Sequence, residues 1–156
     1  LFHHVLSDGA VVGAVRKRPS LVANAIEESL RLEPAAAVLD RYTTREVELD
    51  EVTLGARELV RVSLSAANRD PGSFAEPHRF ELHRPDVRAH VTFAHGPHVC
   101  LGLHLARLEA GIALRRALER LPGLELDPAH DSRPDGLVFR KPPELRVRWR
   151  ATAVVR

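Results

Sequence analysis

The only cysteine in the chain, Cys100, lies between a short turn-forming segment and the longest helical pattern of the sequence. Residues 93–102 read FAHGPHVCLG, in which Gly96 permits a tight turn with positive φ and Pro97 stiffens the backbone that follows. At the start of a helix, free backbone N–H groups and the helix dipole favour the thiolate form of a cysteine, which ligates metals and attacks electrophiles. Gly102 leaves the backbone beside the sulfur open to a flat group. The segment therefore predicts a rigid loop that presents one sulfur.

A helix is predicted over about residues 101–121, because apolar side chains recur there three to four positions apart. Pro122 and Gly123 end this helix. We expect it to be buried mainly at its start, since arginine and glutamate gather towards its end. The predicted apolar stripe consists of Leu101, Leu105, Leu108 and Ile112, widened by Ala106, Ala110, Ala113, Leu114 and Ala117.

Two shorter helices are predicted at the beginning of the chain, and short strands follow them. A weak helical pattern covers about residues 6–17. A second helix starts around Pro19 and ends before Pro34, and its buried stripe is predicted from the recurrence of Val22, Ile26 and Leu30 four positions apart. Strands are predicted at 47–49 and 52–54, which form a hairpin, at 59–62, and at 145–149, whereas 68–90 is irregular. The whole pattern indicates a mainly α chain with small β-sheets, which is the α+β fold class.

The composition indicates one soluble globular domain and narrows the partners that we expect. Of 156 residues, 44% are hydrophobic and 28% are charged, and the net charge of +2 gives little support for nucleic-acid binding. No apolar run approaches the ~20 residues of a membrane span, and one cysteine requires no oxidising compartment, so we expect a cytoplasmic protein without a membrane partner. The sequence has no methionine, even at position 1, which we interpret as the sign of a fragment or a processed product.

The residues alone leave three interpretations of Cys100 open. It can be a buried structural thiol, which is the common state of single cysteines. It can ligate zinc together with His95, His98 and His104, the last of which lies one helical turn beyond the sulfur. It can also be a nucleophile with His98 as its base. Zinc sites usually recruit a second cysteine or a recognisable distant pair of ligands, and a nucleophile needs both a base and an oxyanion donor, which His98 and the helix N–H groups could imitate; neither interpretation is favoured.

The pattern F-x-x-G-x-H-x-C-x-G, continued by LAR at 105–107, resembles the haem-binding signature of the cytochrome P450 haem-thiolate monooxygenases. The resemblance implies that Cys100 is the proximal ligand of haem b and that Gly96 belongs to the haem-binding loop. It also implies that Gly102 lets this loop lie against the porphyrin. Phe93 would pack near the sulfur, where it limits solvent and tunes the hydrogen bonds of the ligand.

A second resemblance to this family concerns three charged residues. Glu28 and Arg31 match its E-x-x-R pair on a helix, and Arg79 falls where a third partner is expected in the later irregular segment. Taken alone, this spacing predicts only a local ion pair, worth about 0.2–0.5 kcal/mol on an exposed helix surface. A buried triad would tie the helix to the irregular segment, and loss of one member would cost about 3–5 kcal/mol.

The resemblance also implies residues that contact the haem edge and the substrate. Arg41 and His98 correspond to the positions that pair with the haem propionates, for which the guanidinium fork is well suited. Ala37, Val38 and Leu39 would line the substrate pocket, which is small and apolar at this point.

The chain departs from the family pattern in three places. Ala94 stands where the family usually has glycine, and Glu51 to Arg57 keeps only one glycine of a usual glycine–proline–glycine turn. The long central helix of the family carries an acidic residue beside a threonine, and no such pair precedes Glu28. We therefore expect a cytochrome P450 fold truncated to its C-terminal part, after the long central helix. Its parts would be two helices in 1–34, a small sheet in 35–67, the meander and cysteine loop in 68–100, the proximal helix in 101–121 and a terminal hairpin in 122–156.

The function that this resemblance implies is oxidation of a small apolar molecule, such as C–H hydroxylation, with O2 and two electrons. A ferredoxin-type electron donor and its reductase would be the partners, with Arg107, Arg115 and Arg116 as candidate contacts. The alternative is a non-catalytic, truncated haem-binding remnant or an interaction module. Half a haem pocket would leave apolar surface exposed, so we also expect self-association through this distal face.

Overall fold

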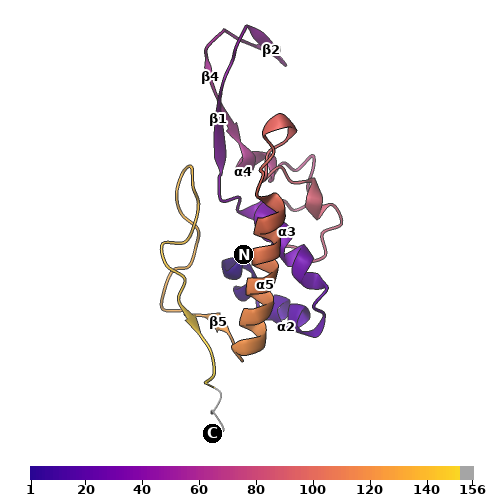
Figure 1. The fold of residues 1–156 in the computed structure, drawn as a ribbon, viewed down its shortest axis with the longest axis vertical. Helices are drawn as coiled ribbons and strands as arrows, with labels where there is room; N and C mark the ends of the chain where they lie inside the picture. Colours follow the sequence, from indigo (N-terminus) through magenta and orange to yellow (C-terminus); the bar gives the residue numbers. More distant parts are fainter. Residues whose placement is uncertain (152–156) are drawn as a thin grey trace.

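The computed structural model describes residues 1–151 of the 156-residue chain. The longer helices pack into one body, and paired strands extend from it as ribbons (Figure 1). The helices are α1 (Phe2–Leu6), α2 (Gly9–Lys17), α3 (Leu21–Leu32), α4 (Leu64–Ala67) and α5 (Leu103–Arg120), with 3-10 turns η1 (Val87–Ala89) and η2 (Gly96–His98). This combination of helices with small sheets confirms the predicted α+β class.

The first 34 residues contain three helices, and the prediction of two was wrong. The side chain of Asp8 accepts a hydrogen bond of 2.7 Å from the amide of Ala10, which caps the start of α2. The weak helical pattern predicted over about 6–17 therefore corresponds to α2, and α1 is a separate short helix before it that was not predicted. The next predicted helix is α3, which ends at Leu32, before Pro34, as expected.

The hydrophobic core lies where α1, α2 and α3 meet α5. Helix α3 contributes Val22, Ala25 and Ile26, and α5 contributes Leu114 and Leu118. Full burial of an aliphatic side chain of this kind contributes about 1.5–3 kcal/mol, so these contacts fix α5 along α3. The position of α5 in turn sets the position of the cysteine loop that precedes it.

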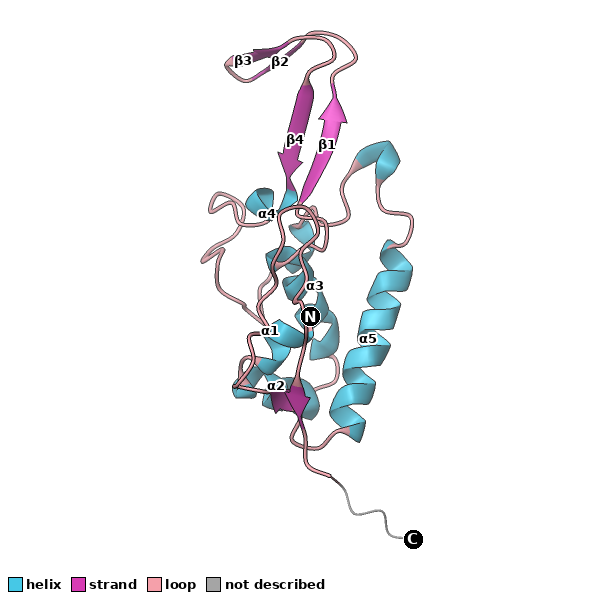
Figure 2. Ribbon diagram, turned by 90° about the vertical axis from the view of Figure 1, so that its left-hand side faces the viewer, coloured by secondary structure: helices cyan, strands magenta, loops and turns pink. Residues whose placement is uncertain are grey.

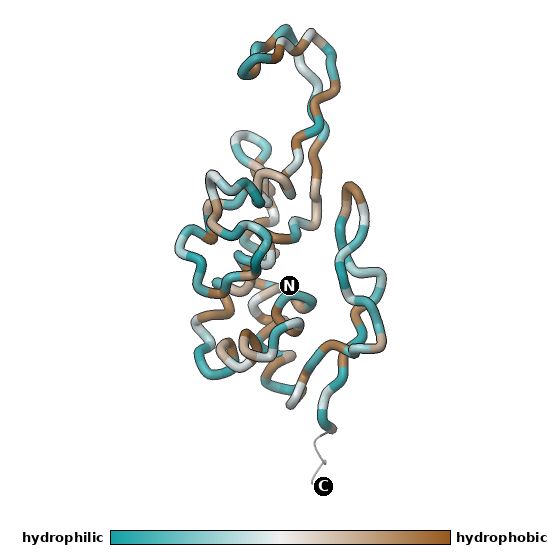
Figure 3. Tube along the Cα trace, turned by 180° about the vertical axis from the view of Figure 1, so that it is seen from behind, coloured by the Kyte–Doolittle hydropathy of each residue, from teal (hydrophilic) through white to brown (hydrophobic). Residues whose placement is uncertain are grey.

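Within residues 1–151, three two-stranded antiparallel sheets complete the fold. Strand β1 (Val38–Tyr42) pairs with β4 (Leu59–Ser63), β2 (Val47–Leu49) with β3 (Val52–Leu54), and β5 (Glu125–Leu126) with β6 (Val147–Arg148). The predicted hairpin of β2 and β3 is confirmed, whereas β1 was not predicted. Figure 2 shows the β1–β4 ribbon standing out from the helical body with β2 and β3 at its far end. Along this ribbon, apolar and polar segments alternate (Figure 3).

The terminal hairpin is shorter than the sequence pattern indicated. The alternating run over 145–149 forms only the two-residue strand β6, and Trp149 is exposed rather than packed on one face. Of the predicted segment 122–156, residues 152–156 lie outside the described residues.

The apolar stripe of α5 is exposed, and the prediction that the helix is buried mainly at its start was wrong. Leu105, Leu108 and Ile112 are 58%, 56% and 47% exposed, whereas Leu114 and Leu118 on the other face are buried. The spacing of leucines identified an apolar face of α5 but did not tell whether another element covers it. In the structure α3 packs against the opposite side of α5. Neither α5 nor any other helix within residues 1–151 is long and apolar enough to cross a membrane.

Candidate functional site

Cys100 ends a loop whose first and last residues are joined through the backbone. The amide of Cys100 donates a hydrogen bond of 2.9 Å to the carbonyl oxygen of Phe93, and η2 lies between them. Gly96 and Ala94 both have positive φ, at 80° and 60°, a conformation that glycine adopts freely and alanine does not. Helix α5 begins at Leu103, so the sulfur precedes the first helical turn. The loop therefore holds the sulfur in place by its own closure.

The sulfur lies on an open surface that is partly apolar. Cys100 is exposed, and Leu101 and Val99 beside it are exposed as well. A β-carbon on Gly96 would meet no atom within 4 Å, and one on Gly102 would meet only the Cys100 sulfur, at 3.9 Å. One accessible thiol, apolar neighbours and two glycines suit a flat apolar group that binds its metal through a single thiolate.

The other interpretations of Cys100 fit the structure less well. Its exposure contradicts a buried structural thiol. Within residues 1–151, no group of three or more His, Cys, Asp or Glu side chains is placed to hold a metal ion, so His95, His98 and His104 do not form a zinc site with it. In this described part of the chain, no hydrogen bond joins the sulfur to His98, as a nucleophile activated by that base requires.

Two further predicted residues, Arg41 and His98, are exposed and lie on different elements. Arg41 lies on β1, and its guanidinium donates to the carbonyl oxygen of Asp40 at 2.8 Å. His98 lies in η2. The β1–β4 ribbon and the cysteine loop both stand at the upper end of the molecule in Figure 1, away from β5. Both side chains are therefore available to an anionic group at that end.

The three residues predicted to line a substrate pocket differ in exposure. Ala37 is buried, and its amide donates 2.8 Å to the carbonyl oxygen of Val138 in the segment that packs against it. Val38 and Leu39 are half-buried at the start of β1. Only Val38 and Leu39 keep enough accessible surface to touch a ligand, so Ala37 is a packing residue in this structure.

Glu28 and Arg31 form a buried ion pair that joins α3 to the irregular segment after α4. Both side chains are fully buried, and Nε and Nη2 of Arg31 donate to the carboxylate of Glu28 at 2.7 and 2.8 Å. The remaining Nη1 donates to the carbonyl oxygens of Asn68 and Pro77 at 2.8 and 2.7 Å. The predicted local pair is thus a buried clamp between two parts of the chain.

The third member of this clamp is Arg84, and the prediction of Arg79 was wrong. Nε of Arg84 donates to both oxygens of Glu28, at 3.0 and 3.1 Å, and Arg84 is buried. The side chain of Arg79 is 63% exposed and pairs with Glu76 at the surface. Arg79 contributes only its carbonyl oxygen, which accepts from Arg31 and Arg84 at 3.1 Å each. An irregular segment has no period, so spacing alone did not tell which of its arginines turns inwards.

A second buried carboxylate, Glu27, was missed by sequence reasoning. Its oxygens accept hydrogen bonds from Nε and Nη2 of Arg107 on α5, at 2.6 and 2.8 Å, and lie 3.0 Å from Nε2 of His90. Burial acts to raise the pKa of Glu27, but the bonds from His90 and Arg107 outweigh it and lower the pKa to about 2. The sequence offered one signal for a buried Glu27: this residue directly follows Ile26, which belongs to the buried stripe of α3.

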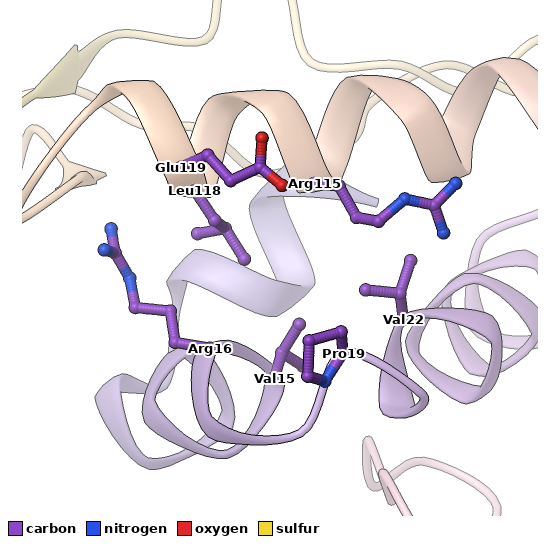
Figure 4. A pocket seen from close by; sticks show the side chains of 7 residues that line it. All are labelled: Val15, Arg16, Pro19, Val22, Arg115, Leu118 and Glu119. Atoms are coloured by element: carbon purple, nitrogen blue, oxygen red, sulfur yellow. The ribbon is translucent and has the colours of Figure 1, made fainter.

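Figure 4 shows a pocket formed by α5 and the helices that precede β1. It lies between the α2–α3 connection and the last turns of α5. Its lining residues are Val15, Arg16, Pro19, Val22, Arg115, Leu118 and Glu119. The pocket contains no residue of the 93–102 loop, so it is separate from the site of Cys100.

Comparison with known proteins identifies one family across most of the chain. The family model described as Cytochrome P450 matches residues 14–147. Cytochrome P450 107B1 of Saccharopolyspora erythraea is 42% identical over 146 residues, which cover 93% of this chain and 32% of that protein. Cytochrome P450 monooxygenase PikC of Streptomyces venezuelae is 40% identical over 153 residues, which cover 94% of this chain and 36% of that protein. The chain spans about a third of the length of these curated relatives.

Solved structures have the same fold over nearly the whole chain. The crystal structure of P450BioI in complex with an acyl carrier protein ligated to hexadec-9Z-enoic acid superposes with a TM-score of 0.87 at 38% identity. This match covers 94% of the present chain and 38% of P450BioI. Mycobacterium marinum cytochrome P450 CYP150A6 in its substrate-free form gives a TM-score of 0.89 at 32% identity, covering 96% and 39% of the two chains.

Proposed function

The chain belongs to the cytochrome P450 family, and from this premise we propose that it is the haem-ligating part of a haem-thiolate monooxygenase, with Cys100 as the iron ligand. Members of this family bind haem b. When bound, thiolate-ligated haem supplies the iron centre at which O2 and two electrons oxidise a C–H bond of the substrate. The observation that carries the proposal is the exposed thiol of Cys100 on a loop closed by the Phe93 carbonyl oxygen.

The surroundings of Cys100 fit this cofactor. The absence of side chains at Gly96 and Gly102 leaves room for a flat ring system to approach the loop. The exposed apolar side chains of Val99 and Leu101 would be covered by that ring system, which stabilises the complex through burial of apolar surface. Cys100 would supply the soft anionic ligand that iron in this family requires.

The proposal assigns supporting roles to residues around the loop. Arg41 and His98 are exposed and can pair with the haem carboxylates, Arg41 through its guanidinium fork. Val38 and Leu39 would contact a small apolar substrate, whereas the buried Ala37 would support their strand. Phe93 would shield one side of the sulfur from water.

An electron donor of the ferredoxin type, with its reductase, is the proposed redox partner. A groove between α3 and α5 is lined by Arg88, Arg107 and Arg115, among other residues. Positive charge there would attract an acidic protein surface and speed association at low ionic strength. Arg107 is already paired with Glu27, and Arg116 with Glu119, so Arg88 and Arg115 are the better candidates for direct contacts.

A second candidate function is a non-catalytic haem-binding remnant or interaction module. The observation that favours it is the exposed stripe of Leu105, Leu108 and Ile112 on α5, which offers an apolar surface to another protein chain. In this case the chain would associate through α5 whether or not it carries haem.

Reconstitution with haem tests the ligand assignment. The chain is folded, supplied with haem, reduced and exposed to CO, and its absorption spectrum is recorded. We expect the red-shifted Soret band of thiolate ligation in the wild type and in a His104→Ala control, and its loss in Cys100→Ala. A thiolate-type band in Cys100→Ala would contradict the assignment. A folded chain without any Soret absorbance would favour an interaction module that does not bind haem.

A further inference from the structure

Glu27 lies where α3 meets α5 and the segment that follows η1. It belongs to α3, its side chain is 4% exposed, and it contacts Arg107 on α5 and His90 just after η1. The amide of Thr92 donates to Nδ1 of His90 at 3.3 Å, so a proton on Nε2 of His90 satisfies both of its contacts. The Glu27 carboxylate thus accepts from three donors of the same chain, two on Arg107 and one on His90.

Arg107 contacts both Glu27 and the first residue of the loop. Its guanidinium carbon lies 4.8 Å from the centre of the Phe93 ring, a distance at which a cation is attracted to an aromatic face. The ring of His90 lies 6.4 Å from that of Phe93 on a tilted plane. Phe93 is thus held by both partners of Glu27, and its carbonyl oxygen accepts the Cys100 amide. One series of direct contacts therefore runs from Glu27 to the sulfur-bearing residue.

The adjacent carboxylate, Glu28, has a different set of partners. It binds Arg31 and Arg84 and thereby joins α3 to the irregular segment, with no contact to the loop among its described bonds. Two neighbouring buried carboxylates on α3 thus connect to different parts of the fold. If Glu27 only held α3 and α5 together, its partner Arg107 would not need to lie over the ring of Phe93, the first residue of the loop.

We propose that Glu27 is a positioning residue for Cys100, acting through Arg107 and Phe93 to hold the loop closed in the conformation that presents the sulfur. The inference rests on the proposed function of Cys100 as a haem ligand. Loss of the Glu27 charge releases the guanidinium from its fixed fork, because a neutral partner cannot hold both of its N–H groups as strongly. Phe93 then loses its fixed cation, and the hydrogen bond from the Cys100 amide opens more often.

Amide hydrogen exchange of the full chain without haem measures this opening directly. The probe is the Cys100 amide, whose protection reports the bond to Phe93, compared with amides in the buried part of α5. We expect Glu27→Gln to lower protection at Cys100 at least about tenfold more than at the α5 core amides. Val15→Ala is the matched control, since Val15 is buried in the core away from the loop and its truncation lowers all globally protected amides together.

A second variant keeps the test decisive if Glu27→Gln does not fold. Arg107→Lys keeps a positive charge for Glu27 but removes the planar group over Phe93. It should reproduce the selective loss of protection at Cys100. Equal loss at Cys100 and at the α5 core in the folded variant, or a wild-type Cys100 amide without protection, would overturn the inference.

The spectrum of the haem-loaded chain separates this inference from the proposed function. A thiolate-type ferrous–CO band in the wild type, combined with unselective exchange in Arg107→Lys, refutes the positioning role alone. Selective exchange in the variants, combined with a wild-type spectrum that lacks thiolate character, refutes the ligand role of Cys100 alone. In the loaded chain, Glu27→Gln should shift the band from thiolate character towards a mixture, whereas Val15→Ala should not.

Discussion

The amide nitrogen of Cys100 and the carbonyl oxygen of Phe93 lie 2.9 Å apart, so one backbone hydrogen bond closes the loop from its first residue to its cysteine. Inside this closed loop, Ala94 has φ of 60° and Gly96 has φ of 80°. Ala94 directly follows Phe93, whose carbonyl oxygen accepts that hydrogen bond. The conformation of Ala94 therefore bears on the position of the sulfur.

Ala94→Gly should stabilise the protein by about 0.5–1 kcal/mol, because the left-handed conformation costs alanine more than the extra chain entropy costs glycine. Equilibrium unfolding in urea measures the change. Ala113→Gly, at an exposed position inside α5, is the control and should destabilise by about 1 kcal/mol. A loss of stability in both variants would show that Ala94 carries no strain.

Arg84→Ala should destabilise the fold by about 3–5 kcal/mol, since it leaves the buried carboxylate of Glu28 with one arginine fewer. Arg79→Ala should change stability by no more than about 1 kcal/mol, because that side chain is exposed and pairs only at the surface. Urea unfolding of the two variants compares the two arginines directly. Equal effects of the two substitutions would contradict the assignment of Arg84 to the clamp.

Elements with a regular period could be predicted from the sequence, and those made by pairing or by irregular backbone could not. The stripe of α3 and the hairpin of β2 and β3 were read from spacing alone. Strand β1 was missed because Asp40 and Arg41 interrupt its apolar pattern. The register of β1 against β4 places Asp40 opposite Arg61, and the two form an ion pair of 2.8 Å that stabilises the ribbon.

The sequence predicted the metal-ligating residue of the candidate site, Cys100, but not the buried residues that hold its loop. The motif around Cys100 indicated which atom would be presented, because glycine and proline positions are local features. The support from Glu27 depends on where α5 crosses α3, and a single sequence does not contain that geometry. Arg107 was accordingly expected at a free surface, whereas its guanidinium is committed to Glu27. Likewise, periodicity found the apolar stripe of α5 but not its exposure.

Stability should fall as the pH decreases below about 6.5, because the folded protein holds His4 without its proton. Burial lowers the pKa of His4 from 6.5 to about 3, its Nε2 is buried without a partner among the described residues, and its ring stacks on Phe80. The unfolded chain takes up this proton near pH 6.5 and the folded chain does not, so stability is lost by up to about 1.4 kcal/mol per pH unit down to the folded pKa.

His4→Leu should reduce the dependence of stability on pH between pH 6.5 and 4.5. This window lies above the titration of Glu27, whose stabilising contribution is lost only as the pH falls from 4.5 towards 2. Urea unfolding at several pH values measures the slope. Thr53→Leu, at an exposed position without a titratable group, is the control and should leave it unchanged. The same slope in wild type and His4→Leu would remove His4 as the cause. His3 and the Leu1 amino group, whose pKa values burial also lowers, should contribute to what slope remains.

The exposed stripe of α5 should make the chain associate with itself in the absence of other partners. Leu105 and Leu108 are a little over half exposed, so covering the remaining surface of each side chain would contribute about 1–2 kcal/mol. Leu105→Lys with Leu108→Lys should therefore raise the dissociation constant of the assembly at least about tenfold, as measured by sedimentation. Ala106→Lys adds charge about 100° around the helix from Leu105 and should have a small effect. A wild-type chain that remains monomeric at high concentration would contradict the prediction and leave the stripe without a role in self-association.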